Sequence, residues 1–410
     1  MKLTLQAREL SHALNAVIGG TDGRGPLSSV LLTVDSLSPN TLTLTTTDNE
    51  IACRASAAVA TGTPGRALLP ARKLHDIVRA LPDVPLTITI KQHNATLVAG
   101  SSRYALAGLD PDQFPDVPEP LVENGVRLDA AAWHGILRRT LYAVGETGAK
   151  FALHGLSLDL VDGILTAVGT DGHRLCVETL EVHGADGVAW SGIITRKAVV
   201  QLAKQLDGVE ELIIGISYQR LVHMQAGSFA RTSRLIEGPY PNWRALEPKR
   251  LAPNALTVSR EELAAAVKRA ALVTTNGLIA LEYTESGAVV TAKSAEHGEA
   301  EEALAGSYMG TPFRTGFQAD YLQDTLGALD GEAVVLQQEG PTGAVSIVDP
   351  AGPASRAYVM PIRLQERERE DGGPVDPPGR LKRVYFPPRS RARLSRHISA
   401  VLSVPGSAWR

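Results

Sequence analysis

The sequence predicts an α+β protein built from three repeated domains, each with two helices and antiparallel sheets of short strands. Three observations lead to this prediction. A strand that passes directly into a helix occurs twice in each third of the chain, short alternating segments lie between these transitions, and one dipeptide returns at a regular interval. Consecutive strands of this kind are typical of antiparallel pairing and not of an alternating βαβ fold.

The helices are predicted where alternating apolar residues give way to apolar residues at helical spacing. The first transition of each repeat falls in residues 2–17, 126–144 and 255–274. The second transition of each repeat falls in residues 68–82, 193–207 and 316–330. We expect two helices of about 11–14 residues in each repeat, near the usual length in globular proteins.

The strands account for most of the remaining chain. Paired strands are predicted in residues 42–56, 165–180 and 289–304. A closing strand is predicted in residues 101–109, 227–236 and 353–364. Together with the strands before the helices, these segments give each repeat roughly eight short strands.

The interval between the repeats is nearly constant. A Thr-Asp pair at 47–48 returns at 170–171, which is 123 positions later, and aligns with Ser294-Ala295 in the third repeat. Arg72 and Arg196 are separated by a similar interval. The expected domains are therefore 1–122, 123–250 and 251–364, followed by an extension over 365–410.

The segment TDGHRLC, residues 170–176, combines side chains that occur in active sites. A hydrolase would use Asp171 and His173 as acid and base and Cys176 as nucleophile. Cys53, however, holds the same place in the first repeat, and a nucleophile is rarely duplicated in this way. We therefore expect both cysteines to be small buried residues, and the Thr-Asp pairs to bond their own backbone in turns.

Composition excludes several other classes. The chain is 44% hydrophobic and 21% charged, which is ordinary for a soluble globular protein. No apolar run is long enough for a membrane span, and the first residues do not resemble a signal peptide. Two cysteines fit a reducing cytoplasm. Zinc spacings and phosphate-binding loops are absent, so we expect neither a metal site nor a cofactor.

The charge is distributed unevenly. Residues 365–410 hold 10 Lys and Arg against 5 Asp and Glu, which leaves 31 basic and 39 acidic residues in 1–364. Many basic residues of this acidic part lie on five of the six predicted helices, whereas the last helix carries Asp320 and Asp324. A shared basic surface is favoured over separate solvated faces, and few aromatic residues interleave with it. This pattern indicates phosphate contact with duplex DNA that is independent of base sequence.

Five motifs are similar to a known family: LPARKLHDIVRALP, TDGHRL, FPDV at 114–117, YPNW at 240–243 and YVMPIRL at 358–364. The chain resembles the beta sliding clamp of bacterial DNA polymerase III. The resemblance implies three clamp domains, closed head to tail into a dimeric ring of six domains with twelve inner helices. Helix axes about 8–10 Å apart and helices about 10–12 Å thick leave a hole of about 20–27 Å, wide enough for duplex DNA.

The resemblance also implies a function without catalysis. The ring would tether the replicative polymerase to double-stranded DNA and so confer processivity. The residues implied to contact DNA are Arg24, Arg72, Lys73, Arg79, Lys150, Arg196 and Lys197. Those implied at the dimer interface are Arg103, Tyr104, Leu106, Leu272, Val273, Glu299, Glu301 and Glu302.

A pocket for short partner peptides is implied between the second and third domains. Its partners would be the polymerase alpha subunit, the clamp loader and other proteins that carry a clamp-binding motif, in the cytoplasm at the nucleoid. The matching residues are Leu153, Thr170, Gly172, His173, Arg174, Leu175, Pro241, Leu246, Tyr358, Met360, Pro361, Ile362, Arg363 and Leu364.

Three departures from the family pattern leave alternatives open. Ala245 stands where many relatives have arginine, which weakly favours a divergent second-copy clamp that tolerates a pocket-binding inhibitor. Residues 23–32 are less rich in proline than in relatives, which affects the expectation for Arg24. The extension 365–410 has a composition typical of disorder. A solvated tail without a role is favoured for it, and the alternative is that its apolar patch at 381–388 occupies the peptide pocket. The hydrolase remains the alternative from another class.

Overall fold

The computed structural model describes residues 1–23, 25–119, 125–146, 151–204, 206, 208–217, 219–247, 253–350, 352 and 355–364. The chain forms two compact units. The first comprises Met1–Ala167 and Thr179–Tyr240, and the second comprises Val168–Glu178 and the chain from Pro241 onward. Arg24, Lys150 and the extension 365–410 lie outside the described residues.

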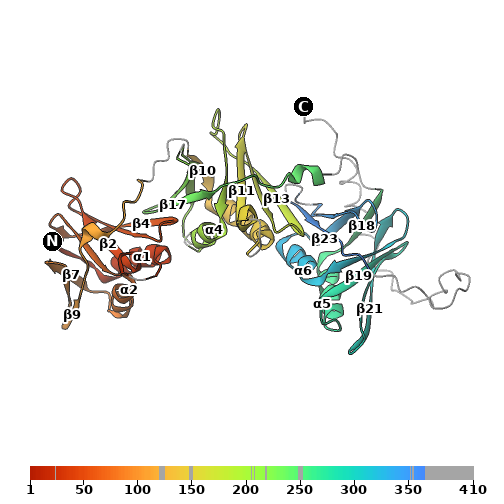
Figure 1. Ribbon diagram of the computed structural model, residues 1–410, viewed down its shortest axis with the longest axis horizontal. Coiled ribbons are helices and arrows are strands. Elements are labelled where there is room, and N and C mark those ends of the chain that lie inside the picture. The colour runs from red at the N-terminus through yellow and green to blue at the C-terminus, as the bar shows by residue number, and fades with distance from the viewer. Residues whose placement is uncertain are drawn as a thin grey trace, which may run out of the picture. The chain divides into compact units, whose positions relative to one another are not determined.

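The described residues contain six α-helices, and each begins directly after a strand, as predicted (Figure 1). Their bounds are α1 Ala7–Val17, α2 Ala71–Ala80, α3 Ala130–Thr140, α4 Arg196–Ala203, α5 Arg260–Ala271 and α6 Ala319–Ala328. The expected length was too long for α2, α4 and α6, which have 10, 8 and 10 residues. In α4 the preceding strand runs up to Thr195, whose side chain caps the helix by accepting from the Ala198 N–H.

The first unit contains a sheet made only of strands from the first repeat, in the order β5-β1-β7-β8-β9. Their bounds are β5 Thr61–Gly62, β1 Lys2–Gln6, β7 Pro85–Lys91, β8 Asn94–Ala99 and β9 Ser102–Leu106. Alternate residues of β1, such as Leu3 and Leu5, point into the core with α1 because the side chains of a strand alternate between its faces. Strand β9 forms one edge of this sheet.

The second sheet of the first unit crosses from the first repeat to the second. Antiparallel pairs connect the strands in the order β6-β2-β3-β4-β17-β16-β15-β10. The bounds are β6 Gly65–Pro70, β2 Ser29–Val34, β3 Thr41–Thr47, β4 Ile51–Ala58, β17 Phe229–Ile236, β16 Leu221–Ala226, β15 Glu211–Ile216 and β10 Val126–Asp129. We call the pairing of β4 with β17 the first joint; the two strands lie side by side in Figure 1.

The second repeat also contributes β11 (Gly155–Val161), β12 (Ile164–Thr170), β13 (Arg174–Glu181) and β14 (Trp190–Thr195). Strand β14 pairs with β11 and, over two residues, with β17. Residues Arg174–Glu178 of β13 pair with β25, a strand of the third repeat. We call this pairing the second joint, and it lies within the second compact unit.

The second unit contains two sheets. One continues from the second joint in the order β13-β25-β24-β23-β18, and the other has the order β22-β19-β20-β21. The bounds are β18 Asn254–Ser259, β19 Leu278–Thr284, β20 Gly287–Ser294, β21 Gly298–Met309, β22 Arg314–Gln318, β23 Ala333–Gln338, β24 Val345–Val348 and β25 Ser355–Val359. Helices α5 and α6 pack together and against a separate apolar core.

The two joints use equivalent strands. In each, the strand that follows the Thr-Asp turn, β4 or β13, pairs with the last strand of the next repeat, β17 or β25. The remaining equivalents are β21 and β9. Among the described residues, β9 pairs only with β8, and Gly298–Ala305 of β21 pair only with β20. Each of these strands therefore keeps one open edge.

The prediction for both cysteines is confirmed. Cys53 is 0% exposed and Cys176 is 1% exposed, and neither forms a disulfide. Burial raises the pKa of the Cys53 thiol although the Arg231 guanidinium opposes this shift. Among the described residues, no helix is long and apolar enough to cross a membrane.

Candidate functional site

The Thr-Asp turn of the first repeat is held by its own side chains, as the sequence predicted. Thr47 Oγ1 donates to the carbonyl oxygen of Ile51 at 2.9 Å. Asp48 Oδ1 accepts from the backbone N–H groups of Glu50 at 2.9 Å and Ile51 at 2.7 Å. The bonds to Asp48 satisfy two N–H groups of the turn, and the Ile51 carbonyl, which also accepts from the Asp48 N–H at 3.2 Å, gains a second donor in Thr47.

The turn of the second repeat has the same bonds. Thr170 Oγ1 donates to the Arg174 carbonyl at 2.7 Å, and Asp171 Oδ1 accepts from the N–H groups of His173 at 2.8 Å and Arg174 at 3.0 Å. The third residue of each turn has a positive φ, 72° at Asn49 and 93° at Gly172. Asparagine and glycine tolerate this conformation best.

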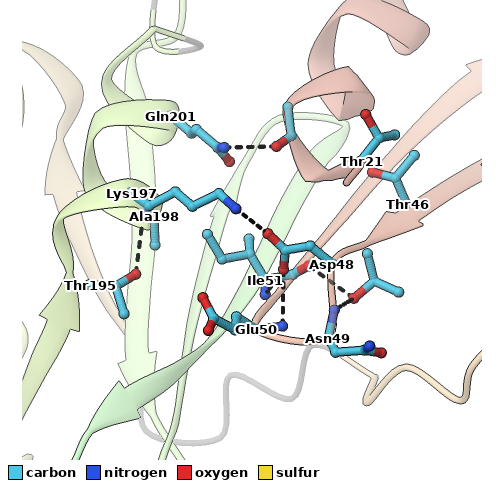
Figure 2. A network of polar contacts seen from close by, with 12 residues as sticks. Thr21, Thr46, Asp48, Asn49, Glu50, Ile51, Thr195, Lys197, Ala198 and Gln201 are labelled. Carbon is cyan, nitrogen blue, oxygen red and sulfur yellow. Dashed lines mark hydrogen bonds and ion pairs between the residues drawn. The ribbon is translucent and has the colours of Figure 1, made fainter. Parts of the chain in front are cut away.

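The second carboxylate oxygen of Asp48 binds a cation from the next repeat. Lys197 Nζ on α4 donates to Asp48 Oδ2 at 2.5 Å (Figure 2). The Asp48 side chain is only 2% exposed, and the hydrogen bond to it raises the pKa of Lys197. Gln201, one turn further along α4, donates to the carbonyl of Gly19 at 2.7 Å. Helix α4 is thus fastened to the first repeat beside the first joint.

At the second joint the charges are reversed. Asp171 Oδ2 accepts from Arg174 Nε at 3.1 Å, and the same guanidinium donates to Asp324 Oδ2 on α6 at 2.5 Å. The Arg174 guanidinium also lies 4.8 Å from the centre of the Tyr321 ring, on which the His173 ring stacks. Partial burial lowers the pKa of Arg174, but the bonds to Asp324 and Asp171 outweigh it and raise the pKa overall.

Sequence reasoning missed Tyr321 and missed the partner of Arg174. The available signal was the acidic composition of residues 319–330, which set the last helix apart from the five basic ones. The Asp48–Lys197 pair was missed as well. Its two residues are 149 positions apart in the sequence, and Arg174 and Asp324 are 150 positions apart. Neither distance can be read from a repeat interval.

The structure brings together two of the segments predicted to form the peptide pocket. Leu175 lies opposite Tyr358 in the β13–β25 pair, and the Met360 N–H donates to the His173 carbonyl at 2.8 Å. Tyr358 is buried, which raises the pKa of its hydroxyl, whereas Met360 and Ile362 remain partly exposed. The chain then turns onto β22.

The end of the described chain and the segment before β18 border this strand pair. The Ile362 N–H donates to the Gly316 carbonyl at 2.8 Å, and Leu364 approaches the same glycine. Pro241 precedes the short 3-10 helix Trp243–Leu246, which includes Ala245. The residue after that helix, Glu247, forms a 3.0 Å ion pair with Arg356 of β25. Leu153 belongs to the first unit, in the 3-10 helix Phe151–His154.

Comparison with known proteins agrees with this architecture. The chain matches the DNA polymerase III beta subunit family in three parts: its N-terminal domain at residues 1–118, its central domain at 127–242 and its C-terminal domain at 248–363. The beta sliding clamps of Vibrio cholerae and Escherichia coli K12 are each 30% identical over 372 and 368 residues, covering 89% of this chain and 100% of theirs.

Solved structures give the same result. The DNA polymerase III beta subunit of Pseudomonas aeruginosa superposes with a TM-score of 0.83 at 29% identity, over 89% of this chain and 100% of that one. The Bacillus subtilis sliding clamp, at 22% identity, has the same fold with a TM-score of 0.84 over the same shares.

The chain belongs to the beta sliding clamp family. Its function is that of the family, a processivity factor for DNA polymerase III, and its fold is the predicted one of three clamp domains. The family is not catalytic, which removes the hydrolase alternative. The geometry of this clamp agrees, because Asp171 uses both carboxylate oxygens within the turn and Cys176 is buried.

The basic residues of this clamp differ in their surroundings. Arg72, Lys73 and Arg79 are exposed on α2, and the described residues offer them no ion-pair partner. On α4, by contrast, Arg196 forms a 2.8 Å ion pair with Glu146, and Lys197 is bound to Asp48.

Six of the eight residues predicted at the clamp's dimer interface lie on its two open edges, and the other two follow α5. Arg103, Tyr104 and Leu106 belong to β9, and the three glutamates belong to β21. Leu272 and Val273 follow α5, and Leu272 is 80% exposed. Two glutamates already have partners in their own chain: Glu302 accepts two bonds from Arg269 at 2.7 and 2.8 Å, and Glu299 accepts one from Lys293 at 2.8 Å.

Proposed function

We propose that two copies of this chain close head to tail into a six-domain ring that encircles duplex DNA. The supporting observation is that both in-chain joints pair equivalent strands, which leaves β9 and β21 as the unused counterparts. A third joint of the same kind can form only between copies. Because each copy offers one edge of each type, two such joints close a ring and cover both edges.

The register of this proposed seam follows from the first joint. There Arg231 lies opposite Cys53, and Ala230 lies opposite Arg54. The β9 residues that correspond to Ala230 and Arg231 by their place after the β8–β9 and β16–β17 hairpins are Arg103 and Tyr104. The β21 residues that correspond to Cys53 and Arg54 are Ala300 and Glu301, because Ala300 lies opposite the inward-facing Ala292 of β20 as Cys53 lies opposite Thr46 of β3. In the same register Tyr104 would face Ala300, and Arg103 would face Glu301. Opposite charges directly across a strand pair are stabilising.

The proposed seam also includes an apolar contact. Tyr104 and Leu106 of one copy would pack on Leu272 and Val273 of the other, as the family resemblance implies. Glu301 is the glutamate available to Arg103, because Glu299 and Glu302 are bound within their own chain. Of the three glutamates expected from the sequence to face Arg103, Glu301 is therefore the proposed main partner.

We expect the DNA contacts to be made with phosphates, by the residues predicted from the sequence. Arg72, Lys73 and Arg79 would contribute most, since Arg196 and Lys197 must give up acidic partners in their own chain. Arg24 and Lys150 remain in the proposal on the family resemblance alone. Contacts of this kind hold a ring on DNA without fixing it to one sequence.

The partner peptides are proposed to bind beside the β13–β25 pair. Partly exposed Met360 and Ile362 offer apolar surface next to the buried Leu175 and Tyr358. The polymerase alpha subunit, the clamp loader and other proteins with a clamp-binding motif are the proposed partners. We propose that the clamp works in the cytoplasm, at the nucleoid. The divergent second-copy alternative stays a prediction, testable by titrating griselimycin, to which a P. aeruginosa clamp is bound in its crystal structure.

The test of the ring is the oligomeric state of charge-exchanged variants, measured by size-exclusion chromatography with light scattering. Wild type should be a dimer at micromolar concentration. Arg103→Glu should weaken the dimer by more than about tenfold, because like charges then face each other. Adding Glu301→Arg should restore it. A monomeric wild type would refute the ring, and equal rescue by Glu299→Arg would refute the proposed register.

A further inference from the structure

The two cations at the start of α4 are each held by an acid of the same chain. Arg196 Nη2 lies 2.8 Å from Glu146 Oε1, and Lys197 Nζ lies 2.5 Å from Asp48 Oδ2. Asp48 comes from the turn between β3 and β4 of the first repeat, and Glu146 lies after α3 in the second. Both cations are among the residues predicted to contact DNA, so a phosphate would have to compete with a carboxylate that is already in place.

The surroundings of Lys197 are more acidic than its single ion pair suggests. The hydrogen bond to Asp48 is the largest cause of the raised pKa of Lys197, and the charges of Asp22 and Glu50 raise it further although partial burial opposes them. Glu50 and Asp48 belong to the same turn, which lies below Lys197 in Figure 2. Three carboxylates around one ammonium group leave an excess of negative charge, which repels a phosphate that approaches Lys197.

The two acids differ in how firmly they hold their cations. The Asp48 side chain is 2% exposed, and its other oxygen, Oδ1, accepts from two N–H groups of the turn. Removing Lys197 would leave this buried carboxylate without its cation, which is costly. The Glu146 side chain is 72% exposed, so its ion pair with Arg196 is weaker and exchanges partners more easily. Lys197 is thus the more strongly withheld of the two cations.

Helix α2 of the first repeat provides the contrast. Arg72 and Lys73 occupy the places of Arg196 and Lys197, directly after the preceding strand, and both are exposed. Within the part of the chain that the structure describes, neither has an ion-pair partner. The two helices therefore differ in the acids that surround their cations and not in the cations themselves.

We propose that Asp48 and Glu146 compete with the DNA phosphates for the cations of α4, and that they limit how strongly the clamp holds the duplex. This inference rests on the proposed DNA contacts. A ring that encloses DNA does not need tight phosphate binding to stay on it. Each phosphate contact must break before the ring moves along the duplex, so the two acids favour sliding.

The experiment is to remove each acid and to measure the affinity for a labelled linear duplex over a range of salt concentrations by fluorescence anisotropy. Asp48→Asn keeps an oxygen for the turn but removes the charge opposite Lys197. Glu146→Gln removes the charge opposite Arg196 at an exposed site, where the fold is not at risk. Each variant should steepen the slope of log affinity against log salt by up to about 0.9, because one more phosphate contact releases counterions.

Two controls show whether a freed cation causes the gain. Asp48→Asn combined with Lys197→Gln should restore the wild-type slope. Glu211→Gln removes the acid of a matched exposed pair on β10 and β15, in which Arg127 Nη1 lies 3.0 Å from Glu211 Oε2, and should leave the slope unchanged. A gain that persists without Lys197, or an equal gain in Glu211→Gln, would overturn the inference, since the effect would then not depend on the cations of α4.

The outcomes also separate this inference from the proposed DNA contacts. A wild-type affinity that does not depend on salt would refute the phosphate contacts themselves. A salt-dependent wild type with unchanged slopes in both Asp48→Asn and Glu146→Gln would leave those contacts intact and overturn the competition.

Discussion

The turns at Asp48 and Asp171 have the same hydrogen bonds to their own backbone. Each also forms an ion pair with the second helix of the next repeat, but the acid and the cation exchange places between the two joints. At the first joint the turn supplies the acid and α4 supplies the cation, whereas at the second joint the turn supplies Arg174 and α6 supplies Asp324. The repeated sequence pattern thus specifies the turn and the strand pairing of each joint, whereas the charged side chains specify which helix the turn contacts. A first turn docked on α6 would bring Asp48 toward Asp324, which is unfavourable.

Removing Asp48, the acid of the ion pair at the first joint, should lower the free energy of unfolding more than any other change proposed here. Asp48→Ala eliminates both the cap of the turn and the partner of Lys197, and we expect a loss of about 2–4 kcal/mol in the free energy of unfolding. Asp48→Asn can keep the cap and should lose about half as much. Chemical denaturation measures both, and equal losses would mean that the cap contributes nothing.

The cationic residues should rank differently at the two joints. Arg174 binds two carboxylates and lies over Tyr321, with a side chain 14% exposed, whereas Lys197 binds one carboxylate and is 46% exposed. We expect Arg174→Ala to cost about 1–3 kcal/mol and Lys197→Ala about 0.5–1 kcal/mol. A larger loss at Lys197 in the same denaturation assay would reverse our ranking of the joints.

Because the cations of α4 are paired within the chain and those of α2 are not paired among the described residues, we expect the two helices to contribute unequally to DNA binding. Arg72→Gln with Lys73→Gln should reduce the slope of log affinity against log salt by up to about 1.8, because two phosphate contacts are lost. Arg196→Gln with Lys197→Gln should reduce it less, since those cations are already paired. Fluorescence anisotropy on duplex DNA measures the slopes. Equal changes for the two helices would show that the in-chain pairs open on DNA.

A smaller effect should appear in the pH dependence of the first joint. His223 on β16 is buried beside Thr232 of β17, and burial lowers the pKa of its imidazole. The unfolded chain therefore binds more protons below pH about 6.5, so this residue stabilises the fold above that pH and the contribution is lost as the pH falls. The melting temperature of His223→Gln should therefore change less with pH than that of wild type between about pH 5 and 6.5. An unchanged pH slope would contradict this assignment.

Much of the fold follows from local pattern in the chain. The order of strands and helices, the burial of Cys53 and Cys176 and the bonds inside the Thr-Asp turns depend on residues close in sequence. Alternation, helical spacing and the short reach of Thr and Asp side chains are sufficient to predict them. The family motifs added the function, because their order and spacing over residues 1–364 are specific.

The tertiary structure alone decided which charges meet and which edges stay open. Asp48 and Lys197 are 149 positions apart, Arg174 and Asp324 are 150 apart, and nothing local to either residue selects its partner. The third hairpin has one residue more between Ala292 and Ala300 than the first has between Thr46 and Cys53, which only the strand pairing reveals. Ser294, and not Ala295, therefore takes the place of Asp48 in the turn. Local sequence determines how a strand or turn is built, whereas the contact between two repeats depends on how their side chains meet in space.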